Sequence, residues 1–182
     1  MEHGKALAWL ADWAQLQKEW QAAAGDAQRE LVKIAESVQK TTYLEGDDWG
    51  ALGDNTILHE HAASRLWDLV HRCRKRILGH IDTLSDIYAR MSVLSQSVYD
   101  HPQYRNFNQS TRQRHENLAG EMASMYQREL VAKSLIANDL GNTQDYETLT
   151  VYLASWQMQP YVNQARIEEI VSAITSDCEW KR

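Results

Sequence analysis

The segment from Asn55 to about Tyr99 reads NTILHEHAASRLWDLVHRCRKRILGHIDTLSDIYARMSVLSQSVY. One stripe of positions recurs along it about every 3.5 residues, and all but one of its members are apolar or small. The stripe consists of Leu66, Leu69/Val70, Cys73, Ile77, His80, Leu84, Ile87, Met91, Leu94 and Val98. This spacing predicts a coiled-coil helix, which would be roughly 65 Å long. A helix of that length must lie against other long helices.

His80 is the polar member of this stripe, and the residues between the stripe positions are mostly charged. A single histidine on an apolar seam is typical of a core position or of a residue that sets the register of a coiled coil. We therefore expect His80 to be structural, not a ligand. The basic cluster from Arg72 to Arg76 falls on the outer faces of the same helix and indicates a solvated surface.

Composition favours an all-α protein that is not a general nucleic-acid binder. The 182 residues include two prolines, eight glycines and one phenylalanine, and the net charge is −6. Few helix breakers and few β-branched runs argue against a sheet protein, and phosphate contacts need a positive surface. Cys73 and Cys178 lie far apart and no signal peptide is recognisable, so we expect free, mostly buried thiols in a reducing compartment. No apolar run is long enough to span a membrane.

The first helix is expected from about Lys5 to Gln39, with an apolar seam weighted by tryptophans, among them Trp13 and Trp20. A tryptophan stripe is more often core than docking patch, although tryptophan is enriched in interface hot spots. The segment from Thr41 to Asn55 contains Gly46, Gly50 and Gly53 among aspartates and is predicted to be a hinge loop. Its acidic residues lack the spacing of a calcium loop. Asp54 or Asn55 is expected to cap the next helix.

The remaining chain predicts one more long helix and two short ones. The caps expected for these three helices are Ser110 or Thr111, then Asp145, then Asn163, and the expected stops are Gly141-Asn142 and Pro160. The expected inner faces comprise Leu118, Met122, Met125/Tyr126, Leu130, Leu135/Ile136 and Leu140, then Leu149, Tyr152, Leu153 and Trp156, then Ile167, Ile170, Val171 and Ile174. Tyr104 and Phe107 are expected to anchor the connector before them.

The predicted fold is thus an all-α, elongated helical bundle or coiled coil of three long helices plus two short C-terminal helices. We expect residues 1–110 to form a long antiparallel hairpin with a loop at 41–54. Residues 111–182 are expected to form a C-terminal helical module.

No motif in the sequence supports a reaction. His59-Glu60-His61 resembles the start of a zincin motif, but histidines two apart point to different helix faces. There is no G-x-S-x-G, P-loop or glycine-rich nucleotide turn. We expect no metal, no cofactor and no enzymatic activity. Two classes stay open: a non-enzymatic interaction subunit, or an enzyme whose site the sequence does not connect.

Two stretches carry a resemblance to a known family. They are MYQRELVAKSLIANDL from Met125 to Leu140 and LTVYLASWQMQPYV from Leu149 to Val162. Together they resemble the C-terminal part of the cyclin-dependent kinase 2-interacting protein family, and Ala11 to Trp20 resembles that family's first helix more weakly. The long middle helix agrees in pattern alone, and the loop at 41–55 does not match.

The resemblance implies a nuclear, and also cytoplasmic, helical adaptor in an AAA+ ATPase complex. Such a subunit would pair with a second small helical subunit and serve large-ribosomal-subunit maturation and replisome or chromatin substrates. The alternative it implies is a scaffold for cyclin-dependent kinase, Cdc7 kinase and the ATR-interacting protein in DNA replication and damage signalling. Neither alternative involves direct contact with nucleic acid or membrane.

One departure from the family concerns phosphorylation, because neither proline here follows a serine or threonine. The family's basic Ser/Thr-Pro extension thus has no counterpart in this sequence. Arg128-Glu129-Leu130 fits a cyclin-docking R-x-L pattern, but Leu130 falls on the expected buried stripe, which favours a chance match.

Nine residues are predicted to contact a partner, in the coiled-coil seam or in the C-terminal module. They are Trp13, Trp20, Leu84, Ile87, Met91, Tyr126, Trp156, Pro160 and Tyr161. For Trp156 two interpretations stay open: packing on the third long helix near Leu135/Ile136, or docking together with Pro160 and Tyr161.

Overall fold

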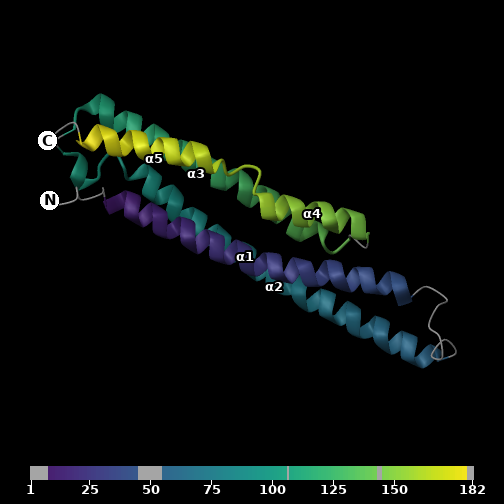
Figure 1. Cartoon of the computed structure of the whole chain (residues 1–182). Coiled ribbons are helices and arrows are strands. Elements are labelled where there is room, and N and C mark those ends of the chain that lie inside the picture. The colour runs from purple at the N-terminus through teal and green to yellow at the C-terminus, as the bar shows by residue number, and fades with distance from the viewer. Residues whose placement is uncertain (1–7, 45–54, 106, 143–144, 180–182) are drawn as a thin grey trace, which may run out of the picture. The chain divides into compact units, whose positions relative to one another are not determined.

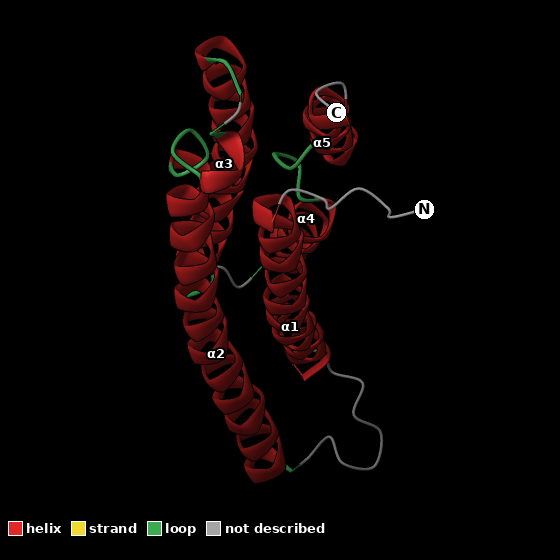
Figure 2. Cartoon of the chain, turned by 90° about the vertical axis from the view of Figure 1, so that its left-hand side faces the viewer, coloured by secondary structure: helices red, strands yellow, loops and turns green. Residues whose placement is uncertain are grey.

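The computed structural model describes residues 8–44, 55–105, 107–142 and 145–179 (Figure 1). Within these ranges it contains helices and connecting loops and no strand, so the predicted all-α class is confirmed (Figure 2). The helices are α1 Ala8–Leu44, α2 Thr56–Gln96, the 3-10 helix η2 Pro102–Tyr104, α3 Gln109–Asp139, α4 Tyr146–Met158 and α5 Gln164–Glu179. None of them is long and apolar enough to cross a bilayer.

Contacts between residues divide the chain into two compact units. The first unit comprises residues 1–22, 83–132 and 159–182, and the second comprises 23–82 and 133–158. The described parts of α1, α2 and α3 therefore contribute to both units, whereas α4 belongs to the second and α5 to the first. The predicted hairpin of residues 1–110 and the C-terminal module of residues 111–182 stay predictions.

The first helix is longer than predicted. It continues to Leu44, whereas the sequence predicted an end at Gln39 and a loop from Thr41. The hydroxyls of Thr41 and Thr42 each donate a 2.7 Å hydrogen bond to a backbone carbonyl three residues earlier, which keeps these polar groups satisfied inside the helix. The remainder of the predicted loop, residues 45–54, lies outside the described residues.

Three of the four predicted caps are confirmed. Side-chain oxygens of Asn55, Asp145 and Asn163 accept backbone N–H groups three residues later, at 3.1, 2.9 and 3.0 Å. The prediction for α3 is wrong: Asn108 is the cap, and its Oδ1 accepts the N–H of Thr111 at 2.7 Å. α3 therefore begins earlier than the sequence indicated.

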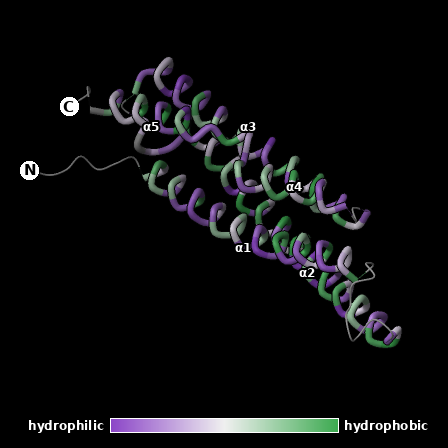
Figure 3. Tube along the Cα trace, turned by 45° about the vertical axis from the view of Figure 1, so that its right-hand side comes forward, coloured by the Kyte–Doolittle hydropathy of each residue, from purple (hydrophilic) through white to green (hydrophobic). Residues whose placement is uncertain are grey.

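Most of the predicted α2 stripe is buried in the cores of the two units, and the tube coloured by hydropathy shows hydrophobic and hydrophilic residues alternating along the helices (Figure 3). The buried members are Val70, Cys73, Ile77, Leu84, Ile87, Met91 and Val98. His80 is half-buried. On α3, Ile136 is buried while Leu135 is 65% exposed, so only one of that pair belongs to the core.

The second unit has a continuous hydrophobic core between α1, α2, α3 and α4. Its members include Leu31, Ile34, Val38, Cys73, Ile77, Ile136, Leu140, Leu149 and Trp156. Trp156 lies in this core and its Nε1–H donates to the carbonyl oxygen of Ala24 at 3.0 Å. Trp156 and Ile136 thus belong to one core, which favours the interpretation in which Trp156 packs on α3.

Candidate functional site

A groove lies between α1 and α2 in the first unit, and we call it the α1–α2 groove. Its volume is about 490 Å³, and its lining residues are Asp12, Gln15, Leu16, Ala89, Arg90, Val93, Leu94 and Ser97. Leu16 is buried and Leu94 half-buried, so aliphatic side chains form the floor. Val93 is 67% exposed. The groove is therefore open and largely apolar.

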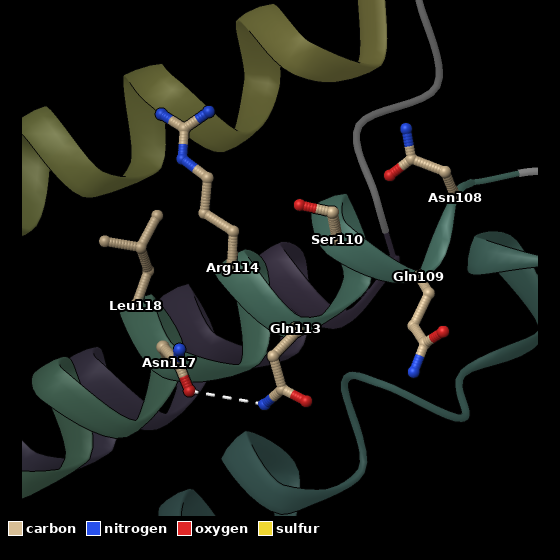
Figure 4. Close-up of a pocket in the computed structure, with 7 residues that line it drawn as sticks. All are labelled: Asn108, Gln109, Ser110, Gln113, Arg114, Asn117 and Leu118. Atoms are coloured by element: carbon tan, nitrogen blue, oxygen red, sulfur yellow. Dashed lines mark hydrogen bonds between the residues drawn. The ribbon is translucent and has the colours of Figure 1, made fainter.

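A second groove, of about 820 Å³, lies along the first turns of α3 and is lined mainly by amides (Figure 4). Its lining residues are Asn108, Gln109, Ser110, Gln113, Arg114, Asn117 and Leu118. Gln113 donates to Asn117 Oδ1 at 3.3 Å, and Arg114 is bound to Asp177 of α5 at 3.0 Å. These polar groups thus have partners within the chain, and none of them resembles an activated catalytic group.

A buried polar network in the first unit was not predicted from the sequence. Trp9 Nε1–H donates to Tyr104 Oη at 2.9 Å, Tyr104 Oη lies 2.9 Å from His115 Nδ1, and His115 Nε2 lies 2.9 Å from Asp177 Oδ2. Asp177 also accepts from Arg114, which is the behaviour of an ionised carboxylate that can only accept. The neutral tautomer that satisfies both contacts has Nε2–H donating to Asp177 and Nδ1 accepting the Tyr104 hydroxyl.

The order Asp177, His115, Tyr104 resembles a hydrolase triad in connectivity alone. Tyr104 and His115 are fully buried, and burial raises the pKa of the tyrosine well above its ordinary value. A hydroxyl that is fully buried within the chain is not accessible to a substrate in this structure. No signal in the sequence pointed to this network, since its members are 11 and 62 residues apart.

A second unpredicted network surrounds Cys73 in the core of the second unit. Glu30 accepts from Lys33 Nζ at 2.7 Å and from Arg76 Nη1 at 3.3 Å, and it also interacts with the Cys73 thiol. Burial and the carboxylate of Glu30 raise the pKa of Cys73 to about 11. A thiol in this state is not a reactive nucleophile. Among the described residues neither cysteine forms a disulfide, which agrees with the prediction of thiols.

Lys133 on α3 is a fully buried cation in the second unit. Its Nζ donates to the carbonyl oxygen of Trp156 at 2.8 Å and lies 4.5 Å from the centroid of the indole ring. The lysine holds the last turn of α4 by a hydrogen bond and a cation–π contact. The sequence offered no signal for this role because a lysine is seldom fully buried.

Seven of the nine predicted partner-binding residues are buried in the chain's own cores. They are Trp13, Trp20, Leu84, Ile87, Met91, Tyr126 and Trp156. Trp13 and Trp20 pack edge-to-face on Tyr126, with ring centroids 6.1 and 5.1 Å apart. The partner role of these seven stays a prediction, and their burial favours the core interpretation.

Pro160 and Tyr161 lie on the surface of the first unit. Tyr161 is 47% exposed, and its backbone N–H donates to Glu129 Oε2 at 3.2 Å. They remain available for a partner. Leu130 is half-buried, so the R-x-L pattern does not present an open leucine.

The exposed face of α4 in the second unit presents several apolar side chains beside the polar residues Glu147, Thr150 and Gln157. Val151 is 64% and Met158 77% exposed, and Ala154 between them is also exposed. Residues 148–158 contain no charged side chain. The described residues contain no group of three histidine, cysteine, aspartate or glutamate side chains placed to hold a metal ion.

No protein-family model matches this chain, and no curated protein matches it significantly.

Proposed function

We propose that this chain is a non-enzymatic helical adaptor subunit that pairs with a second small helical subunit. In this proposal it links an AAA+ ATPase complex to large-ribosomal-subunit maturation and to replisome or chromatin substrates in the nucleus. The assignment of that complex rests on the resemblance of residues 125–162 to the cyclin-dependent kinase 2-interacting protein family.

The observation that carries the adaptor role is the exposed face of α4, which carries no charged side chain beyond Glu147 in its first turn. Val151, Ala154 and Met158 are spaced three and four apart, so they share one face of the helix. Interface cores are depleted of charged residues and enriched in methionine, and contiguous exposed apolar surface marks interaction sites. The buried networks around His115 and Cys73 support the same role, because neither presents a reactive group to solvent.

The test is affinity purification of the tagged chain from its native cells, followed by mass spectrometry. We expect AAA+ ATPases and one small helical protein with the unaltered chain. Val151→Glu together with Met158→Glu should remove them without lowering the melting temperature, since both side chains are exposed. Tyr43→Glu is the matched control, because Tyr43 is 71% exposed on α1 of the same unit.

Enrichment of kinases without ATPases would replace this proposal by the scaffold alternative. Retention of all partners by the double variant would show that the α4 face is not the docking surface.

Tyr161→Ala tests separately whether the exposed ring of Tyr161 contacts a partner. The substitution keeps the backbone bond to Glu129 and removes only the half-exposed ring. A ring that contacts a partner would cost on the order of 2 kcal/mol of binding free energy with little change in melting temperature. A lower melting temperature with unchanged affinity would assign the ring to the fold alone.

A further inference from the structure

The α1–α2 groove is long enough to hold about two turns of an α-helix. Ala89 and Val93 lie four residues apart on one face of α2. Ser97 directly follows the helix, and its N–H donates to Val93 O at 3.1 Å, so the three residues together line one wall. The rise of an α-helix makes this wall about 12 Å long, or roughly two turns. Ala89 and Ser97 are small, which leaves the space between the helices unfilled above Leu16 and Leu94.

The two charged side chains at the rim of the groove, Arg90 and Asp12, differ in whether they have an ion-pair partner. Arg90 is held by Glu19, with Nη1 2.6 Å from Oε2, so its charge is already compensated within the chain. Asp12 on the α1 rim is exposed, and among the described residues no side chain forms a hydrogen bond or ion pair with it. An occupant of the groove would therefore meet an apolar floor and one uncompensated negative charge.

We propose that the α1–α2 groove binds an amphipathic helix of a partner protein, with aliphatic residues at i, i+4 and i+7 and a lysine or arginine that pairs with Asp12. Helices commonly dock in this way, with anchors on one face entering an apolar groove. The basic residue follows from the uncompensated carboxylate, and it also suits a chain whose net charge is −6. This inference deepens the proposed adaptor function and rests on it for its biological partner.

The test uses the full chain and two synthetic helical peptides. Both peptides have an alanine- and glutamine-rich host with leucines at i, i+4 and i+7; one carries lysines beside the leucine stripe and the other carries glutamates. Binding is measured by fluorescence anisotropy. We expect the lysine peptide to bind the unaltered chain and the glutamate peptide to bind at least about tenfold more weakly.

Two substitutions locate the site. Val93→Glu should weaken binding of the lysine peptide by about tenfold or more. Asp12→Lys should reverse the preference, so that the glutamate peptide binds more tightly than the lysine peptide. Val131→Glu is the matched control: Val131 is a 54% exposed valine of the same unit, on α3 and outside the groove. Since Val93 and Asp12 are exposed, unchanged circular dichroism is expected for every variant.

The proposal is overturned if the lysine peptide does not bind at millimolar concentration, or if Val93→Glu binds it as tightly as Val131→Glu. It is also overturned if the unaltered chain forms a dimer that Val93→Glu abolishes, because the occupant is then a second copy. Peptide binding without any ATPase in the affinity purification would retain the groove and reject the adaptor function. Recovery of ATPases without peptide binding would retain the adaptor function and reject the groove as a helix-binding site.

Discussion

At the scale of single residues, the ionisation of Glu30 is strongly coupled to the fold. Burial opposes its charged form, but hydrogen bonds from Lys33, Cys73 and Arg76 outweigh burial and lower the pKa of Glu30 from 4.5 to about 2. Because the folded-state pKa is depressed, its contribution to stability is present above about pH 4.5 and is lost as the pH falls towards 2.

We predict that Glu30→Gln lowers the free energy of unfolding at pH 7 by on the order of 2 kcal/mol, because the common acceptor of Lys33 and Arg76 loses its negative charge while both cations remain partly hydrated. The difference between the two proteins should shrink steadily below pH 4.5, as measured by urea unfolding over a pH series. Glu36→Gln, an exposed site on the same helix, is the control. A difference that does not change with pH would assign the loss to packing instead of charge.

The same network predicts the reactivity of the two thiols. Cys73 is fully buried with a pKa of about 11, whereas Cys178 is half-buried. In a Cys178→Ser variant, labelling with iodoacetamide at pH 8 should therefore proceed only as fast as the protein opens, and denaturant should accelerate it strongly. Rapid labelling of Cys73 under native conditions would contradict the buried network.

At the scale of elements, α2 lies with its stripe in the chain's own cores. Leu84 is fully buried and Ile87 almost so, in the first unit. We predict that Leu84→Asp together with Ile87→Asp unfolds the chain. The free-energy cost of burying two unpaired carboxylates approaches the whole free energy of unfolding of a typical domain. Loss of helical circular dichroism would show this, and Ser85→Asp, exposed on the same turn, should leave it unchanged. A folded double variant that loses only a partner would restore the interface interpretation.

The start of α3 gives a second test at this scale. Asn108 accepts the N–H of Thr111, whereas the sequence pointed to Ser110 or Thr111 as the cap. Asn108→Ala should therefore lower the free energy of unfolding by about 1 kcal/mol, and Ser110→Ala should have little effect. Thermal unfolding of the two variants side by side measures the difference. Equal losses would mean that the cap does not depend on Asn108.

At the scale of the whole molecule, the two units share three helices. α1, α2 and α3 each run from one unit into the other without a break in helical structure. We predict a single calorimetric transition, because unfolding of either unit interrupts three helices that continue into the other unit, and helix formation is cooperative. His115→Ala in the first unit and Trp156→Ala in the second should both lower that one transition. Two separated transitions, each sensitive to one substitution, would show independent units.

Much of the secondary structure was predictable because the signals for it are local. A 3.6-residue pattern identifies the buried face of a helix, and Asn55, Asp145 and Asn163 cap their helices within three residues of themselves. The α3 cap was missed because Asn108, Ser110 and Thr111 offer the same chemistry within one turn. The end of α1 was missed because two threonines, poor helix formers, satisfy their hydroxyls within the helix.

The sequence by itself determined the helical class, the apolar stripes and most helix boundaries, since each depends on residues within a few positions of one another. Only the tertiary structure decided which side chains meet across the chain: His115 with Asp177, Glu30 with Arg76, and Lys133 with the end of α4. It also decided that the α1–α2 groove stays open beside Val93. Periodicity specifies the face that a helix buries, but only the packing of helices against one another selects the partners on that face.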